Sequence, residues 1–114
     1  MPHIILETSP GLKNRFAGAE ALKAMHAFIG AEESVDITRI KSRLYTAETV
    51  YVGDSDMPDE MIHITLKILP GRDDAILRAM TQGLQVIASE KLQGASPVKI
   101  SAEAVLLHKE SYVA

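Results

Sequence analysis

Several absences limit what this sequence of 114 residues can do. It contains no cysteine, so it has no disulfide framework, no thiolate nucleophile and no zinc site built on sulfur. No apolar run is long enough to span a membrane, and the N-terminus lacks the charged and apolar regions of a secretion signal. The net charge is −3 and no basic run is present, which argues against nucleic acid or an anionic membrane as a partner. We therefore expect a cytoplasmic protein that binds neither nucleic acid nor a membrane.

Common site motifs are missing as well. The sequence has no phosphate-binding glycine loop, no dinucleotide fingerprint and no nucleophile elbow. No two of its four histidines have the helical spacing of a metal site, so each is better interpreted as a structural or surface residue. The acidic segment between Gly53 and Glu60 lacks the pattern of a calcium loop, and we expect a solvated loop there.

The hydrophobic pattern predicts a strand, a helix and further strand structure in the first half of the chain. Apolar residues over 2–7 predict a strand that ends before the breaker Pro10-Gly11. Apolar residues at helical spacing then continue to Ile29, and a segment rich in Ile, Val, Thr and Tyr over 37–52 predicts one or two strands. The order is therefore β-α-β.

The second half repeats this order. Alternating apolar residues predict a strand over 61–68, and Pro70-Gly71 precedes a helical pattern that ends near Gly94. A last strand is expected over 98–107.

The two halves also match residue by residue at an offset of 60. The matching pairs are His3 and His63, Ile4 and Ile64, Leu6 and Leu66, Pro10 and Pro70, Gly11 and Gly71, and Ile40 and Ile100. Because the matches fall on corresponding positions, we interpret the chain as one domain built by duplication, with repeats at about 2–52 and 61–107. Two such units predict an α+β fold: a duplicated β-α-β unit with a four-stranded sheet and two helices on one face. The other face is mixed in composition, and another subunit would be a natural cover for it.

Two candidate site residues occur where the repeats differ. Pro2 matches Ile62, and a proline after Met1 usually permits removal of Met1, leaving a free secondary amine at the tip of an apolar strand. Burial would lower the pKa of that amine, ordinarily near 8, toward neutrality, where a general base works best. Arg72 matches Leu12 and lies at the expected start of the second helix, where it could bind a carboxylate bidentately. Taken alone, each residue also has an ordinary explanation, as a tolerated second residue or a solvated side chain.

A row of basic residues forms the other candidate. Arg39, Lys41 and Arg43 alternate along the predicted strand, so they would share one face. Such a row could bind a multiply anionic substrate, but basic side chains also protect exposed strand edges. The spacing leaves both interpretations open.

Three segments resemble the 5-carboxymethyl-2-hydroxymuconate delta-isomerase family of the tautomerase superfamily. They are Met-Pro-His at residues 1–3, Ile-Lys-Ser-Arg at residues 40–43, and His-Ile-Thr-Leu-Lys-Ile at residues 63–68 followed by Gly71-Arg72. The likeness covers most of the chain. The segment over residues 68–72 is also similar to 4-oxalocrotonate tautomerase, whose half-length chain looks like one of the two repeats.

The resemblance implies a homotrimer that needs no cofactor and moves a proton within an unsaturated hydroxy- or keto-polycarboxylate from aromatic-compound breakdown. It implies that Pro2 is the acid–base catalyst and that Arg72 binds a carboxylate and stabilises charge. It also places Lys41 in the catalytic set, at a position where the family has an arginine; lysine keeps the charge without the planar fork that pairs with a carboxylate. The exact substrate therefore stays open.

Arg39, Arg43 and Lys99, the last being the repeat partner of Arg39, are possible substitutes in substrate binding. Two other functions remain as alternatives. One is a non-catalytic trimeric relative that binds a small acid or only mediates interactions. The other is a different proline-dependent reaction, such as decarboxylation or dehalogenation of an unsaturated acid.

Overall fold

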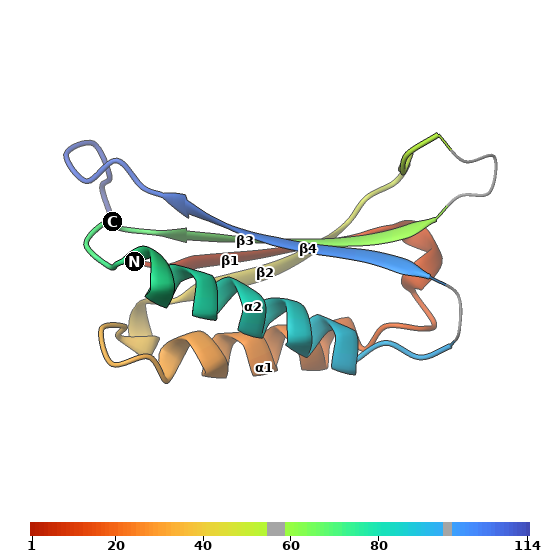
Figure 1. The fold of residues 1–114 in the computed structure, drawn as a ribbon, viewed down its shortest axis with the longest axis horizontal. Helices are drawn as coiled ribbons and strands as arrows, with labels where there is room; N and C mark the ends of the chain where they lie inside the picture. The colour runs from red at the N-terminus through yellow and green to blue at the C-terminus, as the bar shows by residue number, and fades with distance from the viewer. Residues whose placement is uncertain (55–58, 95–96) are drawn as a thin grey trace.

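The fold, given by a computed structural model, is described for residues 1–54, 59–94 and 97–114. Its strands are β1 (His3–Thr8), β2 (Lys41–Thr46), β3 (Glu60–Ile68) and β4 (Val98–Leu106). They form one sheet in the order β2-β1-β3-β4, in which β1 and β2 are parallel, β3 and β4 are parallel, and the central pair is antiparallel. Helices α1 (Gly18–Gly30) and α2 (Asp74–Glu90) connect the parallel pairs, and Figure 1 shows both on one face of the sheet. The predicted α+β architecture is confirmed.

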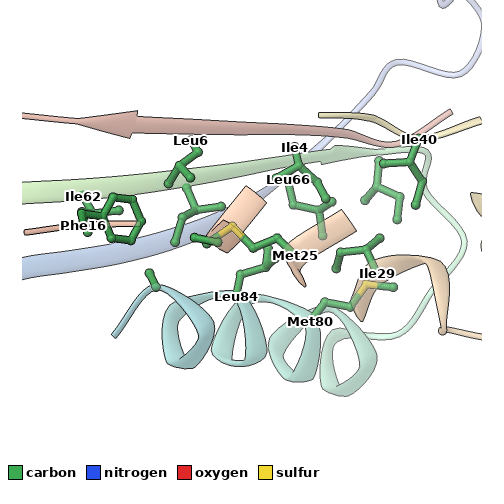
Figure 2. Packing of buried hydrophobic residues seen from close by; sticks show 14 of the residues in the cluster. Ile4, Leu6, Phe16, Met25, Ile29, Ile40, Ile62, Leu66, Met80 and Leu84 are labelled. Atoms are coloured by element: carbon green, nitrogen blue, oxygen red, sulfur yellow. The ribbon is translucent and has the colours of Figure 1, made fainter. Parts of the chain in front are cut away.

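Strand alternation and helix periodicity together form the core between these two layers. Alternate residues of the two central strands point toward the helices and are fully buried. They are Ile4 and Leu6 in β1 and Ile62, Ile64 and Leu66 in β3. The helices contribute Met25, Met80 and Leu84 to the same cluster, as Figure 2 shows. Burial of each large apolar side chain contributes about 1.5–3 kcal/mol, so this layer fixes the strand register on which the site depends.

The first helix begins later than the apolar spacing predicts. Leu12 closes a short 3-10 helix, η1 (Pro10–Leu12), and Phe16 forms an isolated bridge with Leu92. Both side chains are buried all the same. Their spacing therefore reflects contact with the core, and the helix itself starts only at Gly18.

The strand expected over 37–52 is also shorter than predicted, which corrects the proposed basic row. The Asp36 carboxylate accepts a hydrogen bond from the Thr38 backbone N–H (3.0 Å) and so caps a second 3-10 helix, η2 (Ile37–Arg39). Arg39 consequently lies outside β2, and only Lys41 and Arg43 share a strand face. Residues 55–58 of the predicted acidic loop lie outside the described residues, and β3 already begins at Glu60.

The second face of the sheet carries polar side chains and, within the described ranges, no helix covers it. His63 on this face bonds to the Ser101 hydroxyl and to the Glu103 carboxylate, both at 2.6 Å. The segment after β4 returns to the same face, where the Tyr112 hydroxyl lies 2.9 Å from His3 Nε2. None of the helices in the described part of the chain is long and apolar enough to cross a membrane.

Candidate active site

A pocket of about 310 Å³ opens at the end of the sheet where β1 begins and β3 ends. The antiparallel pairing of these strands, with His3 opposite Lys67, brings the N-terminus of the chain beside the segment that leads into α2. Pro2, Arg39 and Arg72 all line this pocket. The structure therefore brings together three of the residues selected from the sequence, from three separate segments.

Pro2 is buried at the base of this pocket, on the helix side of the sheet with Ile4. Its carbonyl accepts a hydrogen bond from the Lys41 backbone N–H (3.0 Å), which extends the pairing of β1 and β2 by one residue. Met1 precedes Pro2 in the sequence, so with Met1 in place the Pro2 nitrogen is an amide and Met1 carries the amine. Burial lowers the pKa of that amine below its ordinary value of 8.0, and repulsion by Arg39, Arg72 and Lys41 lowers it further. An amine at this end of the chain thus faces an environment that favours its neutral, basic form.

Arg72 is held in place by oxygen atoms on both sides of its guanidinium. Its Nε–H donates to the Ser34 hydroxyl (2.7 Å), one Nη2–H to the Ser34 carbonyl (3.0 Å) and one Nη1–H to the Leu69 carbonyl (3.2 Å). The turn before it requires Gly71, whose φ of +126° is strained for any residue with a side chain. The orientation of the guanidinium is therefore set by the protein before any ligand binds.

The start of α2, immediately after Arg72, is capped by the protein itself. Asp73 is the N-cap residue, and its carboxylate accepts a hydrogen bond from the Ile76 backbone N–H (2.9 Å). Arg72 precedes this cap and so lies just outside the helix at whose start the sequence placed it. A carboxylate of the protein already occupies that position.

Arg39 lies at the rim of the pocket with a weaker restraint. Its side chain is 64% exposed and lies 3.7 Å from the Asp36 carboxylate. Hydrogen bonds from Thr38 hold the pKa of Asp36 below its ordinary value, so this carboxylate stays charged at neutral pH. An exposed pair of this kind contributes little to stability, and Arg39 can leave it to bind a ligand at little cost.

The other basic candidates are not among the described residues that line the pocket: Lys41, Arg43 and Lys99. Lys41 and Arg43 project from β2 on the uncovered face of the sheet, beside His3. Lys99 pairs with Met61, at the opposite end of β3 from the pocket. The strand rise places that position about 20 Å away, so within one chain Lys99 is not part of this site.

Arg43 instead fixes the state of His3. Its Nη1–H donates to His3 Nδ1 (3.1 Å), which leaves Nε2 to carry the ring proton and donate to the Tyr112 hydroxyl oxygen. Burial and then the charge of Arg43 lower the pKa of His3 below its ordinary value of 6.5. His3 is therefore neutral at neutral pH and connects β2 to the C-terminal segment.

Analysis of the sequence missed Ser34, which makes two of the three hydrogen bonds that hold Arg72. A signal was present in the repeat: at the 60-residue offset Ser34 matches Gly94, just as Arg72 matches Leu12. The two members of the contact thus differ together between the repeats. Taken as a whole, the pocket offers an amine of lowered pKa beside two guanidinium groups, which suits proton transfer on an anionic substrate. Among the described residues, no group of three or more His, Asp or Glu side chains could hold a metal ion.

Comparison with known proteins identifies the group to which this arrangement belongs. A family profile described as 5-carboxymethyl-2-hydroxymuconate isomerase matches residues 2–107. A search of curated proteins finds no match.

Solved structures of low sequence identity share the fold. A 5-carboxymethyl-2-hydroxymuconate isomerase from Deinococcus radiodurans R1 has a TM-score of 0.84 at 22% identity, over 99% of this chain and 87% of that one. A 5-carboxymethyl-2-hydroxymuconate delta-isomerase has a TM-score of 0.81 at 15% identity, over 100% and 87% of the two chains. A fused 4-OT described as a symmetric trimer has a TM-score of 0.75 at 14% identity, over 95% and 88%. Because this profile matches residues 2–107 of the 114 residues, the chain belongs to the 5-carboxymethyl-2-hydroxymuconate isomerase family.

Proposed function

We propose that this protein, after removal of Met1, uses the Pro2 amine to move a proton within an unsaturated hydroxy- or keto-polycarboxylate similar to 5-carboxymethyl-2-hydroxymuconate. The observation that carries the proposal is the surroundings of the N-terminal amine. It lies in a pocket with Arg39 and Arg72, and burial and these cations lower its pKa. Removal of Met1 would place the Pro2 nitrogen in the same surroundings as a secondary amine.

The proposed reaction needs only one proton shuttle. The neutral Pro2 nitrogen takes the hydroxyl proton of a dienol substrate, and negative charge spreads along the conjugated chain. The resulting ammonium returns the proton to a carbon of that chain and yields the conjugated ketone, so substrate and product are isomers and no cofactor takes part. Arg72 binds a carboxylate and stabilises the charge that develops, and Arg39 binds a second carboxylate at the rim.

The uncovered sheet face supports an additional proposal, that the protein is a homotrimer. The face has no helix over it among the described residues, and the fused 4-OT with the same fold is described as a symmetric trimer. Lys41 and Arg43 project from this face, where they could contact the site or the substrate of a neighbouring subunit. Light scattering at micromolar concentration should report about three chains per particle. A stable and fully active monomer would contradict this assembly.

The decisive experiment compares a free and a blocked Pro2. Protein whose N-terminus is verified by mass spectrometry is tested on a series of enol and keto muconate-type acids, with isomerisation followed by ultraviolet absorbance. The matched control carries one extra glycine between Met1 and Pro2, which converts the prolyl nitrogen into an amide. We expect the control to lose about 10²- to 10⁴-fold in kcat/KM, the usual contribution of a general acid–base group.

Two further results would decide the role of the amine. A ¹⁵N titration of the processed protein should give a Pro2 pKa below 8.0, in the direction seen for the present N-terminal amine. Because the base must be unprotonated, kcat/KM should rise with pH through that value. Full activity in the glycine-extended protein would eliminate proline catalysis.

A further inference from the structure

The loop after α1 holds the guanidinium of Arg72 by more than one bond. Ser34, in this loop, accepts from Arg72 through both its hydroxyl and its carbonyl oxygen. Glu32 in turn holds Ser34, because its carboxylate accepts from the Ser34 backbone N–H (2.7 Å) and from the Ser34 hydroxyl. The chain Glu32–Ser34–Arg72 therefore connects a carboxylate, a hydroxyl and a guanidinium in sequence.

The direction of these hydrogen bonds explains what Glu32 does. A hydroxyl that donates to a carboxylate has its lone pairs directed elsewhere, and polarisation by that carboxylate makes its oxygen a stronger acceptor. The Ser34 hydroxyl is thus oriented to accept from Arg72 Nε–H. The hydrogen bonds from Ser34, together with the charge of Arg72, keep the pKa of Glu32 below its ordinary value of 4.5, so the carboxylate remains an acceptor at neutral pH.

The remaining donors of Arg72 point to the purpose of this restraint. Of the five N–H groups of an arginine, three are used here by Ser34 and Leu69, which leaves one on each terminal nitrogen. Two such N–H groups are what a carboxylate needs for bidentate pairing. We infer that Ser34 is a positioning residue that, with Glu32, orients Arg72 so that its two remaining N–H groups receive a substrate carboxylate. This inference rests on the proposed function for its role in isomerisation, but the geometry can be tested without turnover.

The test uses Ser34→Ala, with Ser34→Thr as the conservative variant that keeps the hydroxyl. Ser89→Ala is the matched control, because Ser89 is an exposed serine in the last turn of α2, far from Arg72 along that helix. The first readout is the Arg72 Nε–H resonance in ¹H–¹⁵N spectra, assigned by its loss in Arg72→Lys. We expect a slowly exchanging signal in wild type, Ser34→Thr and Ser89→Ala, and a rapidly exchanging or shifted one in Ser34→Ala.

The second readout is the affinity for glutarate, a non-reacting dicarboxylate, measured by NMR titration. Loss of one hydrogen bond to the charged group should weaken binding about three- to tenfold in Ser34→Ala and leave Ser34→Thr near wild type. Glu32→Gln should show a smaller loss in the same direction, which provides a second variant if Ser34→Ala folds poorly. An unchanged Arg72 signal or unchanged glutarate affinity in Ser34→Ala would overturn the inference. The two proposals can fail separately. If glutarate affinity depends on Ser34 and Arg72 but the wild-type protein isomerises none of the tested acids, the positioning role is supported and the proposed function is contradicted.

Discussion

The two ends of the central strand pair correspond at the 60-residue offset but differ in chemistry. At one end Pro2 and Arg72 line a pocket with a cationic rim. Their counterparts at the other end, Ile62 and Leu12, are buried in the core. A larger hollow of about 490 Å³ lies beside Leu12, but Lys13 is the sole charged side chain among the described residues that line it. Volume alone would select the end at Leu12, whereas the chemistry of the lining residues favours the end with the N-terminus as the candidate site.

The segments that follow the two central strands show the same difference. After β1, Ser9 is buried, and its hydroxyl accepts from the Met61 backbone N–H (3.0 Å) and donates to Glu60. After β3 the corresponding residue is Leu69, whose carbonyl instead accepts from Arg72. The turn after β1 thus forms hydrogen bonds to β3, whereas the turn after β3 positions the Arg72 guanidinium. Two β-α-β units of one sheet can thus keep similar packing while only one of them contributes the candidate site.

The largest effects expected from single substitutions at the two ends differ in kind: one substitution should reduce activity and the other stability. If Arg72 binds a substrate carboxylate as proposed, Arg72→Ala should lower kcat/KM by about tenfold to a thousandfold, and it should cost at most about 2 kcal/mol of unfolding free energy because the hydrogen bonds it loses are mostly solvent-exposed. Leu12→Ala should instead cost about 2–5 kcal/mol of unfolding free energy, because it empties a buried site, while the folded protein keeps its kcat/KM. Chemical denaturation and steady-state kinetics on both variants measure the contrast. Equal kinetic losses in both would show that the two ends are not functionally distinct.

Lys41 gives a smaller, more specific test, because it lies on the uncovered face rather than in the pocket. Lys41→Ala should cost at least about 1 kcal/mol of transition-state stabilisation, roughly fivefold in kcat/KM, if its charge acts on a bound polycarboxylate. Lys41→Arg should raise kcat/KM several-fold if the substrate is the family's own, since arginine pairs bidentately with a carboxylate. If Lys41→Ala reacts as fast as wild type on all tested acids, Lys41 only protects the strand edge and takes no part in catalysis.

The smallest effect concerns the histidines at corresponding positions of the two repeats. His3 faces Arg43, Lys41, Lys67 and the N-terminal amine, and burial and these charges place its pKa in the folded state below the ordinary 6.5. The unfolded chain therefore binds more protons, and the free energy of unfolding should fall as pH decreases from about 6.5 through the lower folded-state pKa. His3→Gln should remove this part of the acid sensitivity, whereas His63→Gln should keep it, because His3 remains. Urea denaturation of the three proteins across this pH range measures the difference, and an identical pH dependence in wild type and His3→Gln would contradict it.

The central strands and the second helix could be predicted from the sequence because buried side chains recur at the regular spacing of a strand or a helix. The alternation in β1 and β3 and the apolar face of α2 correspond to the buried residues observed. The beginning of α1 and the length of β2 could not be predicted in the same way. A buried residue such as Phe16 gives the same apolar signal whether or not it is helical, and the Asp36 cap replaces strand structure around Arg39 by a local hydrogen bond.

The residues of the candidate site could also be predicted only in part. Pro2 and Arg72 could be selected because each breaks the repeat, and the structure places both in one pocket. Lys99 was selected as the repeat partner of Arg39, but it lies at the other end of the sheet because the central strands are antiparallel. Ser34 carries no charge and no recognisable motif, so its part in the site depends on a contact between residues 38 positions apart.

The hydrogen bond between His3 and Tyr112 has a practical consequence for protein engineering. It joins residues 109 positions apart, and Figure 1 shows the N- and C-termini at the same end of the molecule. Adjacent termini ordinarily make a domain a good subject for circular permutation. Here a covalent link between the ends would preserve the packing but convert the prolyl nitrogen into an amide, and an affinity tag at the N-terminus would do the same. A tag after Ala114 leaves the amine free but extends a segment held beside His3, so a cleavable C-terminal tag with a flexible linker is the arrangement that leaves both ends undisturbed.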